Sequence, residues 1–189
     1  MINLFLHLVM MVNIQPPVRF LISFLLLFGL FYGLNLLFIG ITAPGGWYSS
    51  ILDQYFNYIR AWRQFCILST TKILEFSGYT IQTTETTLKV KGHSGFRLVY
   101  SCLGYGVMSF FAAFTLSFPK PFRSRIFFLA AGLIVIQLLN TIRFVLISLF
   151  YDPITRFPVN HHDLFNCLLY ASLLGMMYVW VNYRKKTAY

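Results

Sequence analysis

The chain has 189 residues, of which 58% are hydrophobic, 19% aromatic and only 11% charged. This composition is typical of a membrane protein and argues against an ordinary soluble domain. A net charge of +10 would point to nucleic acid in a soluble protein. Here most basic residues flank apolar runs, so we predict that they mark membrane topology and that nucleic acid is not a partner.

The N-terminal part is predicted to contain one transmembrane helix. The first 15 residues are apolar but lack the basic start and the small-residue cleavage site of a signal peptide, so we expect an interfacial or disordered lead-in. Pro16 and Pro17 interrupt the chain, and the uncharged run 20–41 is long enough to span a bilayer as a helix. The helix breakers in TAPGGW end it.

Residues 45–101 are predicted to form an extracytoplasmic helix followed by a small β-hairpin. In 51–77 apolar residues recur at spacings of three and four, which indicates an amphipathic helix lying on the membrane or on the protein. The apolar side consists of Ile51, Tyr55, Ile59, Trp62 and Cys66, and the opposite side of Asp53, Asn57, Arg60 and Gln64. In 79–100 apolar and charged residues alternate around a GHSG turn, which predicts a hairpin or three-stranded patch ending at Cys102.

Three further spans are predicted at 103–119, 126–150 and 164–183, within a single membrane domain that covers 1–189. The basic residues of 120–125 and 184–186 lie in short segments, and such segments prefer the cytoplasm. The predicted fold is therefore an all-α polytopic membrane protein with about four transmembrane helices and both termini inside. We expect it in the inner, cytoplasmic membrane of the cell, with the lipid bilayer as a partner.

This topology places three chemically useful groups at one depth, near the outer surface. Cys102 lies at the outer end of the second span, and His161 and His162 lie at the outer end of the fourth. Arg143 lies about 26 Å along the third span from its inner start, at about 1.5 Å per residue, in a core about 30 Å thick.

Each group also has a structural interpretation. An arginine within a span is functional or paired by default, although Arg143 could instead snorkel to the outer interface. Asn140 falls on the same helix face and could hold the guanidinium. The two histidines, which precede Asp163, are suited to pair with a nucleophilic cysteine, but an interfacial polar loop is an alternative. We expect no metal ion and no other cofactor.

The three cysteines are predicted to differ in role. Cys66 and Cys167 are expected to pack in apolar surroundings. If the second span begins near Cys102, the helix dipole would favour the thiolate of that residue. Gly104 and Gly106 would let a substrate chain or a neighbouring helix approach closely.

In combination, these segments resemble the exosortase/archaeosortase family over roughly residues 45–183. The resemblance rests on Cys102-Leu103-Gly104 after an extracytoplasmic hairpin, Asn140-Thr141-Ile142-Arg143 in the next span, and His162-Asp163 opening the last span. The family commonly has serine where this chain has Leu103, and often glycine where it has Asn166. Many of its members also have more spans than this chain.

The resemblance implies a membrane cysteine protease or transpeptidase whose active site faces the extracytoplasmic side. Its substrates would be membrane-anchored proteins that end in a short motif, an apolar helix and a basic tail, and it would transfer each cleaved protein to an acceptor. By match, Cys102 would be the nucleophile, His162 its acid/base partner and Arg143 the stabiliser of the oxyanion or thiolate. Asn140, Gly104 and Asp163 would support them.

Two other functions fit parts of the sequence. In a non-enzymatic membrane subunit or adaptor, Arg143 would pair with Asp163 or with a partner helix, and Cys102 would only pack. In a small transporter Arg143 would bind an anion, but the spans contain too few polar residues to favour this function.

Overall fold

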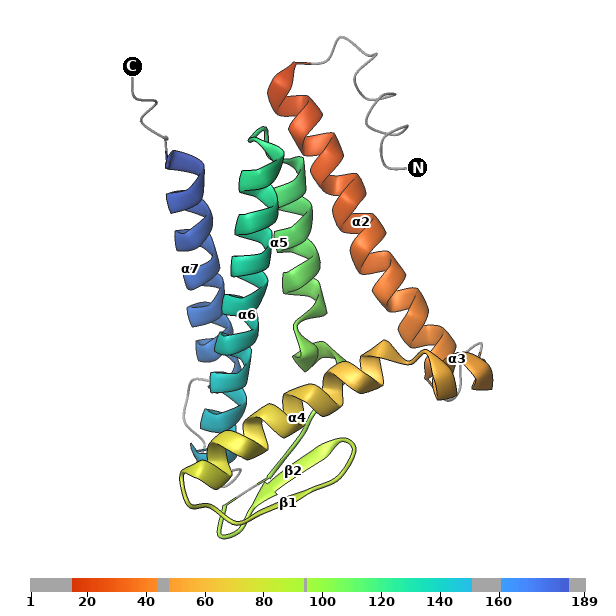
Figure 1. Cartoon of the computed structure of the whole chain (residues 1–189), viewed down its shortest axis with the longest axis vertical. Helices are drawn as coiled ribbons and strands as arrows, with labels where there is room; N and C mark the ends of the chain where they lie inside the picture. Colours follow the sequence, from red (N-terminus) through yellow and green to blue (C-terminus); the bar gives the residue numbers. More distant parts are fainter. Residues whose placement is uncertain (1–14, 44–47, 94, 151–160, 184–189) are drawn as a thin grey trace. The chain divides into compact units, whose positions relative to one another are not determined.

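The structure is a computed structural model that describes residues 15–43, 48–93, 95–150 and 161–183, without the side chains of 161–165. The chain is mostly helical, with one small sheet (Figure 1). The helices are α2 (Pro16–Thr42), α3 (Ser50–Tyr55), α4 (Tyr58–Phe76), α5 (Tyr105–Ser117), α6 (Phe122–Phe150) and α7 (His161–Asn182), and η1 (Tyr100–Leu103) is a 3-10 turn. The strands are β1 (Ile81–Thr83), β2 (Thr87–Val90) and β3 (Phe96–Arg97).

The elements form two compact units. Unit 1 contains α2, α5 and the first part of α6, up to Leu133. Unit 2 contains α3, α4, the sheet and η1, together with the rest of α6 from Ile134 and helix α7. The residues predicted to carry chemistry all belong to unit 2.

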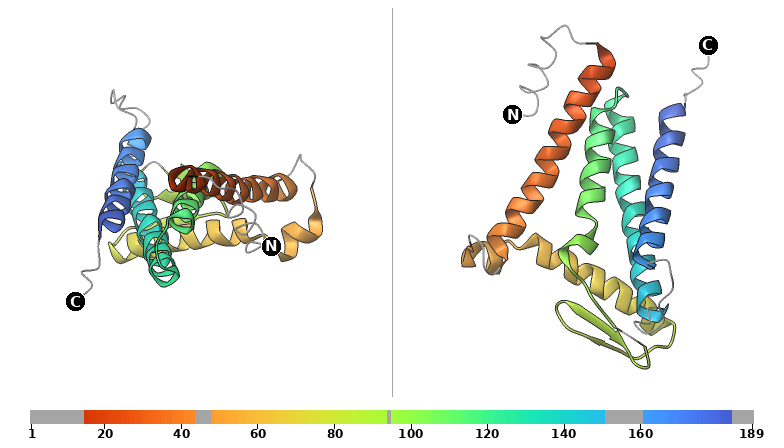
Figure 2. Two further views of the ribbon diagram at one scale, coloured as in Figure 1. Left: turned by 90° about the horizontal axis from the view of Figure 1, so that it is seen from above. Right: turned by 180° about the vertical axis from the view of Figure 1, so that it is seen from behind.

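In unit 1, α2 lies beside α5 (Figure 2). Phenylalanine rings from the two helices pack against each other. Phe20, Phe24 and Phe28 follow one another at intervals of four, so they form a single stripe along α2. Their rings meet those of Phe110, Phe114 and Phe118 edge-on, with centroid separations of 5.3 to 6.1 Å. Such edge-to-face pairs are favourable because the positive ring edge meets the negative ring face.

Within the described residues, two helices, α2 and α6, are long and apolar enough to cross a membrane. They contain the runs 20–41 and 126–150, for which spans are predicted. Helix α5, in the predicted span 103–119, is apolar but has only 13 residues. Helix α7 coincides closely with the predicted span 164–183. The outer side of α2 is covered with exposed leucines, as expected for a helix in contact with lipid.

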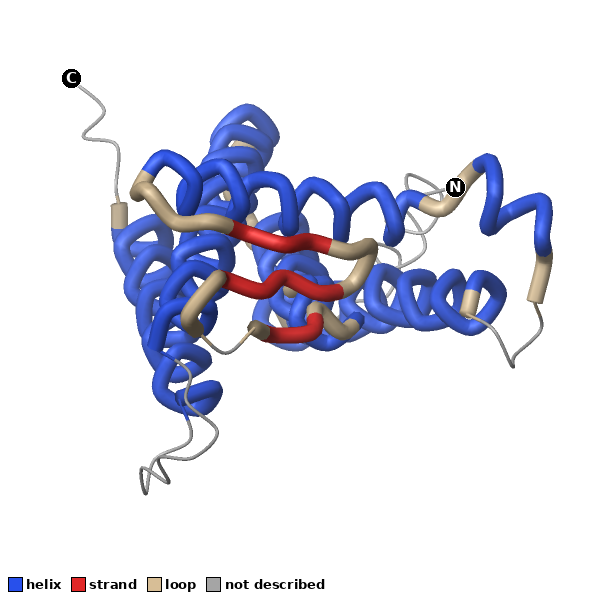
Figure 3. The backbone as a smooth tube through the Cα atoms, turned by 90° about the horizontal axis from the view of Figure 1, so that it is seen from below, coloured by secondary structure: helices blue, strands red, loops and turns tan. Residues whose placement is uncertain are grey.

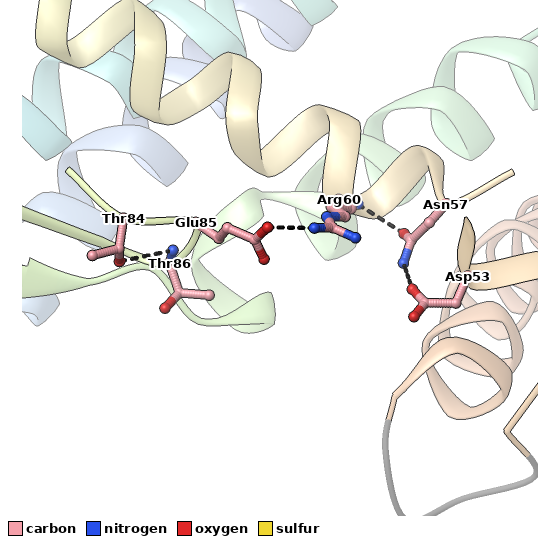
Figure 4. Close-up of polar contacts among 6 residues, drawn as sticks. All are labelled: Asp53, Asn57, Arg60, Thr84, Glu85 and Thr86. Carbon is pink, nitrogen blue, oxygen red and sulfur yellow. Dashed lines mark hydrogen bonds and ion pairs between the residues drawn. The ribbon is translucent and has the colours of Figure 1, made fainter. Parts of the chain in front are cut away.

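In unit 2, the single helix predicted over 51–77 is in fact two helices, separated at Phe56 and Asn57. The side-chain oxygen of Asn57 accepts the backbone N–H of Arg60 at 2.8 Å and so caps α4 (Figure 4). Its amide nitrogen donates to Asp53 at 2.7 Å. Arg60 in turn pairs with Glu85 in the turn between β1 and β2.

Helix α4 contacts β1 and β2, and its buried residues include Ile59, Cys66 and Leu74. Ile59 and Cys66 are buried, as expected for the predicted apolar side, whereas Ile51 and Tyr55 are not covered by other parts of the chain. Those two side chains, on α3, are 66% and 75% exposed. The break before α4 separates them from the stripe that continues along α4.

The three-stranded patch predicted in 79–100 is confirmed. Its strands pair antiparallel in the order β1-β2-β3, with Leu88 opposite Thr83 on one side and Phe96 on the other (Figure 3). Leu88 and Val90 are buried while Lys89 between them is exposed, as the alternation predicts. The buried pair packs against Leu74 of α4, with Val145 and Leu149 of α6 alongside.

Candidate functional site

The candidate nucleophile Cys102 lies in η1, between the sheet and α5. Gly104 ends this turn with a φ of +82°, a left-handed conformation that side chains disfavour. Helix α5 begins only at Tyr105. Cys102 therefore lies in a turn of four residues directly before α5, and the first residue of that helix follows it by three positions.

The backbone carbonyl of Cys102 is held by two side chains of α6. Arg143 Nη2 donates to this oxygen at 2.8 Å, and Asn140 Nδ2 donates to it at 3.3 Å. The two donors are three residues apart, so they lie on one face of the helix. Asn140 thus shares an acceptor with Arg143, whereas the sequence suggested that it would hold the guanidinium itself.

The guanidinium of Arg143 is enclosed within unit 2. The residue is 9% exposed, and Nη1 donates to Asn166 Oδ1 of α7 at 3.1 Å. Among the described residues Nε has no hydrogen-bond partner. The side chain is therefore held inside the protein by two neutral acceptors, and this arrangement differs from a snorkelling anchor, whose head group would reach the interface.

Helix α4 fixes the same turn from another direction. Trp62 Nε1 donates to the carbonyl of Leu103 at 3.4 Å, and the guanidinium of Arg63 lies 4.5 Å from the centre of the Tyr100 ring. Leu103 itself is fully buried. Side chains from α4 and α6 thus bind two consecutive carbonyls of η1, and they hold the backbone of Cys102 in one place.

A second thiol lies close to the site. Cys66 of α4 is fully buried, and its Sγ accepts a hydrogen bond from Gln137 Nε2 of α6 at 3.3 Å. Burial raises the pKa of the Cys66 thiol, while the Gln137 hydrogen bond and the charge of Arg143 oppose that rise. The neutral thiol fits the predicted packing role of Cys66.

The remaining cysteines differ in exposure from each other. Cys102 is half-buried, so a reagent or substrate can reach part of it. Cys167 on α7 is exposed, and the prediction that it packs inside the protein is wrong.

The predicted acid/base group lies at the start of α7. This helix begins at His161, so His162 and Asp163 belong to its first turn, but their side chains lie outside the described residues. Asn166, which contacts Arg143, follows His162 by four residues, or about one helical turn. The described residues contain no group of three or more His, Cys, Asp or Glu side chains that could hold a metal ion.

Three contributors to this arrangement did not emerge from the sequence as site residues, namely Trp62, Gln137 and Asn166. Asn166 had a visible signal, because an asparagine in an apolar helix, one turn after a candidate catalytic histidine, needs a hydrogen-bond partner. No family model, curated protein or solved structure matches the chain. The function must therefore be inferred from the site and from the motifs.

Proposed function

We propose that the protein is a membrane cysteine protease or transpeptidase of the exosortase/archaeosortase type. It would cleave a C-terminal sorting signal and transfer the substrate protein to an acceptor. One observation carries this proposal: the buried Arg143 guanidinium binds the backbone of Cys102 and keeps an Nε–H that has no acceptor among the side chains that the structure describes. A buried N–H without an acceptor is costly, and an oxyanion formed at Cys102 would satisfy it.

In the proposed reaction, the thiolate of Cys102 attacks the carbonyl carbon of a substrate peptide bond. A C–S bond forms, and the carbonyl electrons move onto oxygen, which accepts a hydrogen bond from Arg143. When the intermediate collapses, the C–N bond breaks and His162 donates a proton to the departing amine. The acceptor nucleophile then attacks the thioester carbonyl and gives its proton to His162, and the C–S bond breaks to release the thiolate.

The membrane arrangement is part of the proposal. Helices α2 and α6 would be two of four spans, with α5 and α7 as the others. The basic residues of 120–125 and 184–186 would remain on the cytoplasmic side, which places Cys102 on the extracytoplasmic side of the inner membrane. Exposed apolar side chains along α7, including Leu168, Leu174 and Val179, support contact between this helix and lipid.

A second candidate function is a non-enzymatic membrane subunit or adaptor. It is favoured by the fact that Arg143 donates to neutral acceptors, which would also be suitable for a purely structural link between α6, α7 and η1. In that case the thiol of Cys102 would have no chemical role.

Co-expression with a reporter separates the two functions. The reporter would carry the C-terminal motif, apolar helix and basic tail of a membrane protein from the source organism. We expect the parent to convert it to a shorter form, and Cys102→Ser to leave it intact while accumulating normally. Cys167→Ser is the matched control and should retain activity. Equal processing by the Cys102→Ser variant would exclude the proposed chemistry.

A further inference from the structure

We infer that Asn166 is a positioning residue, which orients the Arg143 guanidinium toward Cys102 and aligns the start of α7 with the reacting turn. This inference rests on the proposed function. It concerns a side chain that the sequence marked only as a departure from the family pattern.

The guanidinium is a rigid fork, so two bonded arms determine where the third N–H points. Nη2 is fixed on the carbonyl of Cys102 at 2.8 Å, and Nη1 is fixed on Asn166 Oδ1 at 3.1 Å. With Asn166 in place, the direction of Nε–H is set. Without Asn166, the guanidinium could rotate about its remaining hydrogen bond to the Cys102 carbonyl, and the direction of Nε–H would no longer be fixed.

Burial makes this acceptor important. Arg143 is only 9% exposed, so water cannot readily replace a lost partner at Nη1. Asn166 is neutral, and it can therefore bind the guanidinium without cancelling its charge. An acidic residue at the same position would also accept the bond, but it would neutralise the cation that the proposed oxyanion needs.

The same contact links two parts of the proposed machinery. His162 belongs to the first turn of α7, four residues before Asn166. The bond from Asn166 to Arg143 therefore fixes the start of α7, which contains the proposed acid/base residue, with respect to the turn that carries Cys102. Orientation of this kind contributes strongly to rate when the reacting groups lie on separate elements.

The test uses iodoacetamide and the full-length chain in detergent, with mass spectrometry of the Cys102 peptide as the readout. We expect Asn166→Leu, which keeps the approximate volume but removes the acceptor, to slow Cys102 alkylation about tenfold, the effect of one hydrogen bond to a charged group. Asn166→Asp keeps an acceptor but offsets the charge of the guanidinium, so its alkylation rate should fall between those of Asn166→Leu and the parent. Asn182→Leu, on the same helix, is the control, because Asn182 donates to the carbonyl of Tyr178 within α7.

A double-mutant cycle with Arg143→Lys distinguishes positioning from general packing. If Asn166 acts through the guanidinium, Asn166→Leu should cause no further loss in the lysine background. An equal loss in both backgrounds, or no loss in either, would overturn the inference. If Asn166→Leu does not fold, Asn166→Ala is compared with Asn166→Asp in the same cycle.

The alkylation assay requires no sorting signal, so its result is independent of the reporter experiment. Failure to process the reporter, with the coupling intact, would reject the proposed function alone. Processing without coupling would reject the role of Asn166 alone.

Discussion

The two units of the protein use different kinds of contact between their elements. In unit 1, ring contacts join α2 and α5, and Asn35 donates to Ser109 at 3.4 Å. In unit 2, buried Arg143 and Asn140 donate to a single backbone carbonyl. Ring packing needs only apolar surface, whereas a buried cation is costly unless its geometry is satisfied. From this difference we infer a supporting role for unit 1 and propose that the chemistry belongs to unit 2.

The largest effect is expected from a change to the planar guanidinium of Arg143 in unit 2. Arg143→Lys keeps the charge but cannot bind the Cys102 carbonyl and Asn166 in one plane, so we expect processing to fall about 10³-fold at normal accumulation. Arg125→Lys is the matched control, because Arg125 lies on the same helix and also donates to a carbonyl, that of Leu116 at 2.6 Å. Full activity of Arg143→Lys would show that the planar guanidinium is not required for processing.

The converse change removes a ring from unit 1. Phe111 is fully buried with its ring 5.2 Å from that of Phe128, so Phe111→Ala should lower the free energy of unfolding by about 3 kcal/mol. Alkylation of Cys102 in the fraction that stays folded should remain at the parental rate. Phe127→Ala, at a position 79% exposed, should leave thermal unfolding almost unchanged. A drop in Cys102 reactivity that exceeds the loss of folded protein would mean that the units are not separable in this way.

A smaller effect is expected from the turn that presents Cys102. Gly104 has a φ of +82°, so Gly104→Ala should cost about 1–2 kcal/mol of stability. Gly29→Ala in α2 is the control, because its helical position has open space around it and alanine favours the helix. Thermal unfolding of the two variants should therefore shift in opposite directions. A tolerated alanine at 104 would show that the turn can relax.

The smallest predicted effect concerns pH and the buried thiol of Cys66. Burial raises the pKa of this thiol in the folded chain, so the folded state favours the protonated form. The resulting stabilisation is fully present below the unfolded pKa of about 8.5 and is lost as the pH rises through the folded value. Cys66→Ser, which does not titrate there, should lose less stability than the parent between pH 8 and 10. Parallel pH profiles of thermal unfolding would contradict this account.

Much of the fold follows from local patterns in the sequence. The uncharged run 20–41 and the alternation of Leu88, Lys89 and Val90 each predict their element, because composition and period decide it locally. The break before α4 was missed because the apolar periodicity continues across Asn57, where side-chain capping competes with the helix. Periodicity also groups Ile51 and Tyr55 on one side without showing whether anything covers them.

The candidate site was only partly predictable. The sequence marked Cys102 and Arg143, since a cysteine near two glycines and an arginine in an apolar run stand out from their surroundings. It did not show that the arginine binds the backbone of Cys102. Every residue has a backbone carbonyl, so the residue types alone do not indicate which carbonyl accepts a given donor. Nor did it predict a site role for Asn166. This residue is 23 positions from Arg143 in the sequence, and their hydrogen bond depends on how α6 and α7 pack together.

The central claim is that Cys102 forms a covalent intermediate with the substrate, and trapping this intermediate tests it most directly. The reaction of the parent with the reporter would be quenched in acid, and the mass of the Cys102 peptide would be measured by mass spectrometry. The measurement would be repeated after treatment with hydroxylamine, which cleaves thioesters. The account predicts a hydroxylamine-sensitive adduct on Cys102 whose mass matches the substrate fragment on the N-terminal side of the cut. An unmodified Cys102 throughout active processing, or processing by Cys102→Ser at the parental rate, would contradict it.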